Sequence, residues 1–256
     1  MANGYNMRNI AEVVLLVGVS WALQDQGRSW TGTCVSGNRQ SPIDLGETQG
    51  IGEEQLTVSP FNSSYAPLSL HYPPLDSTYA SHQAASTYLL THLQGGFTAV
   101  PIGSAASVRY QLERVEFRTP AEHRLGGRRY ELEMQMIHRG EDGSKAGLAV
   151  WYERSERKSS VLEAVIQDTP LSFFSELGPQ FSDFHFYSGS QTVPPCSEDI
   201  TWYLLGSKPA SASQIQFFTQ MWPGAGNARE AQSTNGRWVY HMIPGEQGKF
   251  LQDEKQ

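Results

Sequence analysis

Short runs in which apolar and polar residues alternate recur along most of this chain. A period of two places successive side chains on opposite faces of an extended strand, which is typical of half-buried β-strands. Turn-forming pairs such as Pro73-Pro74, Gly95-Gly96 and Gly126-Gly127 bound many of these runs. The pattern predicts strands at residues 68–71, 87–93, 107–117, 130–138, 148–152 and 200–205.

Helical periodicity is scarce by comparison. Residues 159–167 (SSVLEAVIQ) begin with a serine that can cap a helix, and their apolar residues are spaced for one helical face. Residues 212–222 are a second candidate. The chain is therefore expected to be mostly β, in an α+β arrangement with a few short helices.

An apolar stretch lies near the N-terminus. Residues 10–23 (IAEVVLLVGVSWAL) are apolar except for Glu12 and Ser20, and their 14 residues are fewer than the roughly twenty that cross a bilayer core. They match the apolar part of a secretory signal, with cleavage after Ala22. We expect residues 1–22 to be a signal peptide or a retained hydrophobic segment, which leaves membrane association through residues 10–23 open. A segment packed on its own domain is the third alternative.

The remainder of the chain shows no internal repeat and no low-complexity linker. One domain over residues 23–247 is therefore the simplest division, followed by a polar tail at residues 248–256.

Charge narrows the range of partners. The 256 residues carry a formal net charge of −7. Nucleic-acid binding depends on many Lys and Arg contacts to phosphates, so this balance argues against a nucleic-acid partner. It also argues against a general affinity for heparin-like or anionic membrane surfaces. The locally basic residues 124–129 (RLGGRR) are interpreted as a solvated turn.

The chain has two cysteines, Cys34 and Cys196. An even number of cysteines in a chain of this length does not establish a disulfide, and from the residues alone two free buried thiols are the simpler interpretation. Asn62 begins an Asn-Ser-Ser sequence and is a glycosylation candidate.

Four segments carry a family resemblance. They are GNRQSPIDL at residues 37–45, PAEH at 120–123 followed by YELE at 130–133, GSQTVPPCSE at 189–198, and a weaker match from Asn227 to Arg237. In order and spacing they resemble the α-class carbonic anhydrases over roughly residues 21–240. The resemblance implies a single domain built around a large, twisted, mainly antiparallel sheet of about ten strands.

The resemblance also implies a disulfide between Cys34 and Cys196. This bridge would close a loop of roughly 160 residues and, in the chain-entropy account, stabilise the fold by about 4–5 kcal/mol. It implies an oxidising compartment, on the secretory route or in an organelle lumen, and a secreted or membrane-associated protein.

Active members of the family bind zinc through three histidines, two of them two residues apart on one strand and the third on the neighbouring strand. Neutral imidazoles suit Zn²⁺, and a water in the fourth position becomes a hydroxide that attacks CO₂. Here the matching positions hold Glu116, Arg118 and Gln135. A guanidinium has no lone pair to offer and repels a cation, so we expect no zinc and no other cofactor.

Other positions of the implied site are partly retained. The proton-shuttle position falls near Gly96, which offers no histidine. Thr192 and Glu122 match the pair that orients the zinc-bound hydroxide, and Glu133 matches the carboxylate behind the third histidine. We interpret these three as vestigial residues that support the fold.

A structural hypothesis follows from the cation at Arg118. Glu116 shares its strand face, and Glu122 and Glu133 should lie nearby if the family geometry holds. We therefore expect Arg118 to form a buried ion pair or triad with these carboxylates. A structure with Arg118 turned to solvent would contradict this hypothesis.

The sequence leads to three functional hypotheses. The first is that the chain is not an enzyme but a carbonic-anhydrase-related protein that binds a protein partner, either as an extracellular protein or as a subunit of a larger assembly. The second is a carbonic anhydrase with an unusual metal site. The third is a secreted storage or carbohydrate-binding protein, and a small-molecule or glycan ligand stays open under it.

Overall fold

A computed structural model describes residues 26–46, 68–72, 80–83 and 87–242, apart from 103, 105, 179 and 182. Several parts of the sequence-based prediction lie outside these ranges: residues 1–22, the apolar stretch 10–23, Asn62 and the tail 248–256. No helix within them is long and apolar enough to cross a membrane.

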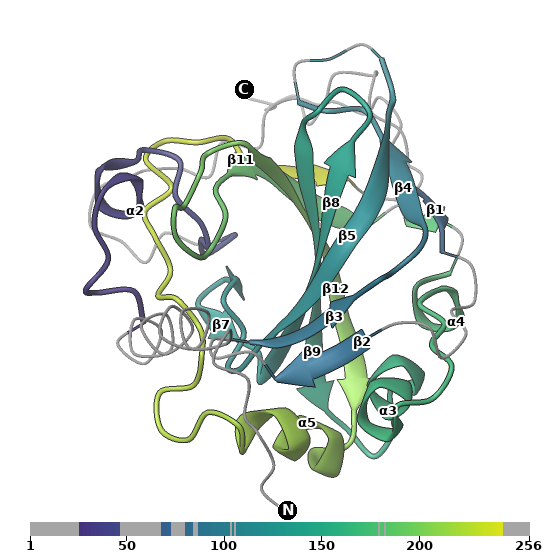
Figure 1. The fold of residues 1–256 in the computed structure, drawn as a ribbon. Coiled ribbons are helices and arrows are strands. Elements are labelled where there is room, and N and C mark those ends of the chain that lie inside the picture. The colour runs from purple at the N-terminus through teal and green to yellow at the C-terminus, as the bar shows by residue number, and fades with distance from the viewer. Residues whose placement is uncertain are drawn as a thin grey trace, which may run out of the picture.

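A curled sheet dominates the described part of the molecule (Figure 1). The strands are β1 (Leu68–His71), β2 (Ala80–Gln83), β3 (Tyr88–Thr91), β4 (Gly96–Ala99), β5 (Val108–Arg118), β6 (Arg124–Leu125), β7 (Arg128–Arg129), β8 (Leu132–Gly140), β9 (Lys145–Arg154), β10 (Gln180–Phe181), β11 (Phe184–Gly189), β12 (Ile200–Ala210) and β13 (Tyr240–Met242). The helices are α2 (Thr33–Ser36), α3 (Ser160–Gln167), α4 (Phe174–Leu177) and α5 (Ala212–Thr219).

Within the described residues, 11 strands form one sheet. The main path runs β10-β1-β4-β5-β8-β9-β12-β11-β13, and β3 joins β2 to β5 beside it. Neighbouring strands are antiparallel except for β9 and β12, which are parallel. The hairpin of β6 and β7 is separate and turns at Gly126 and Gly127, whose positive φ angles of 58° and 74° favour glycine. The mainly antiparallel sheet expected from the family resemblance is confirmed.

Each run predicted from alternation overlaps a strand, and β1 has the predicted bounds. Both predicted helices form as well. The side chain of Ser159 accepts a hydrogen bond from Leu162 N and caps α3. Ser211 and Gln214 form a reciprocal capping box at the start of α5.

The strand β8 shows how the fold positions polar side chains inside the molecule. Leu132, Met134 and Met136 alternate onto one face of the sheet and join the larger core cluster, which also includes residues of α3 and α5. Glu133 and Gln135 therefore project from the opposite face. Both are buried, so this second face carries an internal polar cluster.

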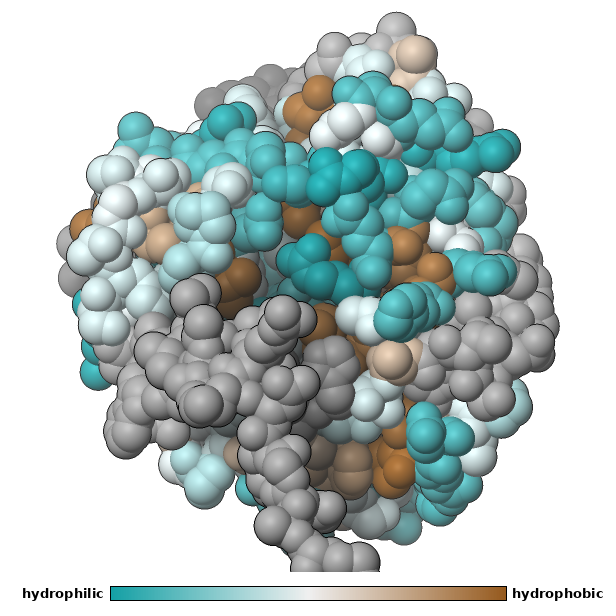
Figure 2. All heavy atoms as spheres, viewed as in Figure 1, coloured by the Kyte–Doolittle hydropathy of each residue, from teal (hydrophilic) through white to brown (hydrophobic). Residues whose placement is uncertain are grey.

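The outer surface over the upper parts of β5 and β8 is mainly hydrophilic (Figure 2). Surface ion pairs such as Arg139 with Glu113, at 2.5 Å, contribute to it. The helices α3, α4 and α5 lie together at one end of the sheet (Figure 1).

Candidate functional site

The three positions that the resemblance assigns to metal ligands do come together. Glu116 and Arg118 lie two residues apart on β5, so their side chains share one face. The register pairs Glu116 with Gln135 of β8, and Arg118 with Glu133. All four side chains are buried. Two adjacent strands therefore place two carboxylates, a guanidinium and an amide in one closed cluster.

Arg118 is the cation of this cluster, and its side chain is 0% exposed. Its Nη2 donates a short hydrogen bond to Glu116 Oε2, and its Nε lies 3.4 Å from Glu122 Oε1. Burial alone disfavours the charged guanidinium, but the carboxylates outweigh burial and raise the pKa of Arg118. The buried ion pair expected from the sequence is thus present.

Glu116 is held between two arginines. Arg114 Nε donates to Glu116 Oε1 at 2.6 Å, while Arg118 contacts the other oxygen. Burial favours the neutral acid, yet the two guanidinium groups lower the pKa of Glu116. Both carboxylate oxygens are therefore engaged by cations of the protein itself.

Gln135 links the remaining carboxylates. Its Nε2 donates to Glu122 Oε2 at 2.7 Å and to Glu133 Oε1 at 2.8 Å. Because both amide hydrogens are used in this way, the Gln135 amide nitrogen faces the carboxylates. The hydroxyl of Thr192 lies 3.5 Å from Gln135 Oε1, on the other side of the amide.

Glu133 anchors a chain of hydrogen bonds that leaves the cluster. It accepts from the His123 backbone N–H at 2.8 Å, and its Oε1 lies 2.7 Å from His123 Nδ1. His123 Nε2 lies 2.8 Å from the Tyr187 hydroxyl, which donates to Ser41 Oγ at 2.8 Å. Burial opposes ionisation of Glu133, but His123 and its hydrogen bonds prevail and lower the pKa of Glu133. The chain of contacts ties β8 to β11 and to the QSPIDL segment.

Glu122 differs from Glu116 and Glu133 in the direction in which its pKa is shifted. Burial raises its pKa, and the neighbouring Glu133 carboxylate adds to this effect against the opposing charge of Arg118. The backbone N–H of Arg229 donates to Glu122 Oε1 at 2.9 Å. Glu122 is thus the carboxylate of the cluster that takes up a proton most readily.

Two further positions lie away from this cluster. Gly96 begins β4, where a side-chain Cβ would meet the Tyr110 carbonyl oxygen at 1.8 Å. The backbone at the expected proton-shuttle position therefore leaves no room for a histidine side chain. His138 lies near the far end of β8, with Nε2 2.7 Å from the Tyr72 hydroxyl, and burial lowers its pKa to about 3.

The residues of the cluster do not fit zinc. Zinc requires donors with a free lone pair, such as imidazole, thiolate or carboxylate. Arg118 offers none, the Gln135 amide nitrogen donates to carboxylates, and both oxygens of Glu116 are engaged by arginines. In the described ranges, no group of three or more His, Cys, Asp or Glu residues could hold a metal ion. That the protein carries no zinc stays a prediction.

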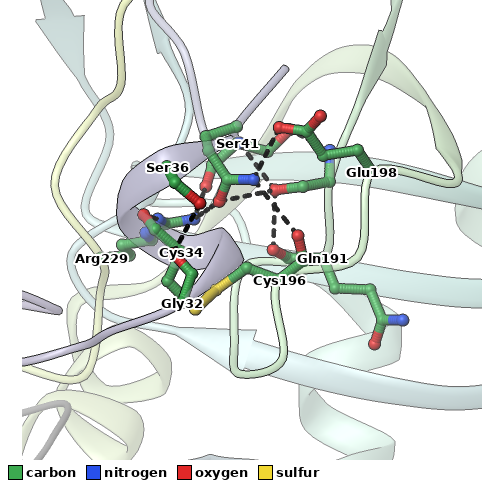
Figure 3. The surroundings of a disulfide bond; sticks show 10 residues. Gly32, Cys34, Ser36, Ser41, Gln191, Cys196, Glu198 and Arg229 are labelled. Atoms are coloured by element: carbon green, nitrogen blue, oxygen red, sulfur yellow. Dashed lines mark hydrogen bonds between the residues drawn. A yellow bond between two sulfur atoms is a disulfide. The ribbon is translucent and has the colours of Figure 1, made fainter. Parts of the chain in front are cut away.

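The disulfide between Cys34 and Cys196 is present, with a sequence separation of 162 residues (Figure 3). Arg229 Nη2 donates to the Cys34 carbonyl at 2.7 Å, and Gln40 Nε2 donates to the Cys196 carbonyl at 3.2 Å. The bridge thereby holds α2 against the loop after β11. A structural disulfide indicates an oxidising compartment, secreted or lumenal.

Two arginines of the cluster were not singled out from the sequence. Arg114 lies two residues before Glu116 on β5, and strand periodicity could have placed it on the same face. Arg229 belongs to the segment that begins at Asn227, but its backbone contact with Glu122 joins residues 107 positions apart, which no local pattern reveals.

Comparisons with known proteins confirm the family resemblance. The family model described as eukaryotic-type carbonic anhydrase matches residues 24–243. Dioscorin DB3L of Dioscorea polystachya is 33% identical over 192 residues, covering 68% of this chain and 63% of that protein, which is less than two thirds of its length. A carbonic anhydrase of Nostoc sp. is 27% identical over 223 residues, covering 82% of this chain and 78% of that protein.

The fold of this chain is also similar to that of solved structures. The α-carbonic anhydrase of Photobacterium profundum superposes with a TM-score of 0.65 at 25% identity, covering 85% of this chain and 95% of that chain. A dioscorin in complex with ascorbate has the same TM-score at 23% identity, covering 82% of this chain and 88% of that chain, which shows the shared fold.

One expectation must be corrected. The sequence-based prediction that the chain is not an enzyme is contradicted by these comparisons, because the relatives include proteins named carbonic anhydrase from Nostoc sp., Pectobacterium atrosepticum and Photobacterium profundum. The residues at positions 116, 118 and 135 do not by themselves settle whether the chain is an enzyme. They establish only that three histidines are missing, and the comparisons favour an enzyme or leave the class open.

Proposed function

The chain belongs to the eukaryotic-type carbonic anhydrase family, and we propose that it uses this scaffold to bind a protein partner, as a binding or structural subunit of a larger assembly. The charged side chains of the buried cluster on β5 and β8 pair with one another. They therefore support the scaffold and do not contact the partner. The proposal places that contact on the outer surface.

Two exposed apolar side chains carry this proposal. Among the described residues, the exposed large hydrophobic residues are Val35 of α2, which is 70% exposed, and Trp238, which is 42% exposed. Large apolar and aromatic side chains on a surface are characteristic of protein interfaces, where tryptophan contributes strongly to affinity. We refer to the region around these two residues as the Val35–Trp238 surface.

The segments that bear these residues are joined to each other. Asn235 Nδ2 donates to the Asn38 carbonyl at 3.0 Å, and Arg237 Nη2 donates to the Gln40 carbonyl at 2.7 Å. The disulfide also ties α2 to the loop after β11. A surface held in place before binding loses less conformational entropy on association, which favours a specific partner.

The compartment follows from the disulfide. We propose that the partner is met on the secretory route or in an organelle lumen, since the bridge persists under oxidising conditions. In this proposal, membrane association comes through the partner or through residues 10–23.

The test compares complexes isolated from the source cells. The tagged chain, its Val35→Ser/Trp238→Ser variant and a Gln220→Ser control on the exposed end of α5 would be expressed at equal levels. Native mass spectrometry should show the wild type and the control in the same stoichiometric complex and the double variant as a free chain. A wild-type protein that is monomeric in its own compartment would contradict the proposal.

Carbon dioxide hydration is the second candidate, because relatives named carbonic anhydrase favour it. It would require an arrangement of groups other than three histidines around zinc. Stopped-flow CO₂ hydration on the purified protein tests it directly. A rate above the buffer that is lost in Glu122→Gln, with the fold retained, would support this second function independently of any partner.

A further inference from the structure

The strand β13 ends the main path of the sheet, and among the described strands it pairs with β11 alone. Three residue pairs join the two strands: Phe184 with Met242, His185 with His241, and Phe186 with Tyr240. The middle pair consists of two histidines. A terminal strand held by so few pairs opens more easily than the inner strands of the sheet, so its central pair strongly affects whether it stays in place.

The two histidine rings lie face to face. Their centroids are 3.9 Å apart and their planes differ by 11°. His241 Nε2 lies 2.9 Å from Asp183 Oδ1, so a proton on this ring is compensated by a carboxylate. A second proton, on His185, would place two imidazolium ions in contact with each other.

The surroundings of His185 supply no further compensation. On β12, the residue opposite His185 is Leu204, which is apolar and buried. On β11, the carboxylate of Asp183 is 66% exposed and already contacts His241. The next residue on this face of β11 is Tyr187, whose hydroxyl donates to Ser41 Oγ. Within the described residues, the charges that act on His185 are therefore those of His241 and Asp183.

This arrangement makes the pairing of β13 depend on pH. Burial lowers the pKa of His185 to about 4, and His241 adds to this effect against the Asp183 carboxylate. If β13 leaves β11, His185 loses its stacked neighbour and becomes exposed, and its pKa returns to about 6.5. Between these two pH values the open arrangement binds a proton that the closed one does not, so a falling pH favours opening.

We propose that His185 and His241 form a proton-sensitive latch that releases β13 from β11 in acidic surroundings. Protonation of His185 converts the central pair of the strand pairing into two facing cations with one carboxylate between them. This inference goes beyond the proposed protein partner and does not depend on it, because the isolated chain contains the whole latch.

Hydrogen–deuterium exchange of the purified full chain at pH 7 and pH 5 tests the proposal. Labelling times are scaled for the slower intrinsic exchange of amides at the lower pH. In the wild type, the equilibrium constant for opening of β13 should rise by about twentyfold between pH 7 and pH 5. At pH 5, β13 should also exchange faster than β12, whose amides are exposed only when the inner sheet opens.

Three variants separate the latch from a general loss of stability. His185→Phe keeps a ring that can stack on His241 but does not titrate, so β13 should lose most of its response to pH. His71→Phe is the matched control, because it makes the same change at an exposed histidine of β1, and it should respond like the wild type. Asp183→Asn removes the compensating carboxylate and should shift the opening of β13 to a higher pH.

Near-ultraviolet circular dichroism at pH 7 should show all variants folded. The proposal is overturned if wild-type β13 opens equally at both pH values, or if it opens only together with β12. It is also overturned if His185→Phe responds to pH like His71→Phe, or if Asp183→Asn leaves the pH of opening unchanged.

Discussion

Arg118 Nε lies 3.4 Å from Glu122 Oε1, and both side chains are completely buried. Removing two charges from water is costly, and their mutual attraction offsets this cost only when the remaining polar atoms are also satisfied. Here Glu116, Gln135 and the Arg229 backbone supply those contacts. The loss of any one charge would therefore leave its partners buried without compensation.

Replacing Arg118 by methionine should destabilise the protein strongly. The substitution keeps much of the side-chain volume but leaves Glu122 buried without its cation and Glu116 paired with Arg114 alone. Removing one partner of a buried ion pair typically costs about 3–5 kcal/mol. Urea unfolding followed by tryptophan fluorescence measures the change. Arg128→Met is the control, because Arg128 forms an exposed ion pair with Glu153 of the kind that contributes about 0–1 kcal/mol. Equal effects of the two substitutions would contradict a compensating role for Arg118.

Stability should fall as the pH drops below about 6.5, in part because of His138. Burial lowers the pKa of His138 to about 3, whereas in the unfolded chain it returns to its ordinary value. Between these two pH values the unfolded chain binds a proton that the folded protein does not. Each such group reduces the free energy of unfolding by up to about 1.4 kcal/mol per pH unit.

The check is a series of unfolding curves between pH 7 and pH 5. His138→Gln should lose stability less steeply with falling pH than the wild type, while the exposed His92→Gln should follow the wild type. Parallel pH profiles for all three proteins would show that His138 does not titrate as described.

Reduction of the disulfide should destabilise the fold by about 4–5 kcal/mol, since the bridge closes a very long loop in the unfolded chain. The protein contains two cysteines in total, so a reductant acts on this bridge alone. Unfolding midpoints with and without dithiothreitol measure the effect, and Cys34→Ser/Cys196→Ser should reproduce the reduced value. A double-serine variant as stable as the oxidised protein would disprove this contribution.

The sequence predicted the strands that matter most for the site, because β5 and β8 are long and alternate apolar and polar residues, with one break in β5 where the register shifts between Leu112 and Arg114. It therefore placed Glu116 and Arg118 on one face correctly. The sequence did not predict β2, because this strand is short and mostly polar (Ala80–Gln83). Its pairing with β3 defines the strand, and its own sequence shows no alternation. The contact of Arg229 with Glu122 was missed because tertiary structure alone brings these segments together.

Restoring histidines should create a metal site if the register is correct. In Glu116→His/Arg118→His/Gln135→His, three imidazoles would project from one face of β5 and β8, as tetrahedral zinc sites require. Cobalt should then give visible absorption bands at one ion per chain. The wild type should give none, and a folded triple variant without bands would mean that these positions do not converge.

The most direct test of the account is the zinc content of the protein purified from its source, measured by elemental mass spectrometry. We predict far less than one zinc per chain, because Arg118 holds the position among the carboxylates that a metal ion would need. One tightly held zinc per chain, retained through dialysis against a weak chelator, would contradict this assignment of Arg118.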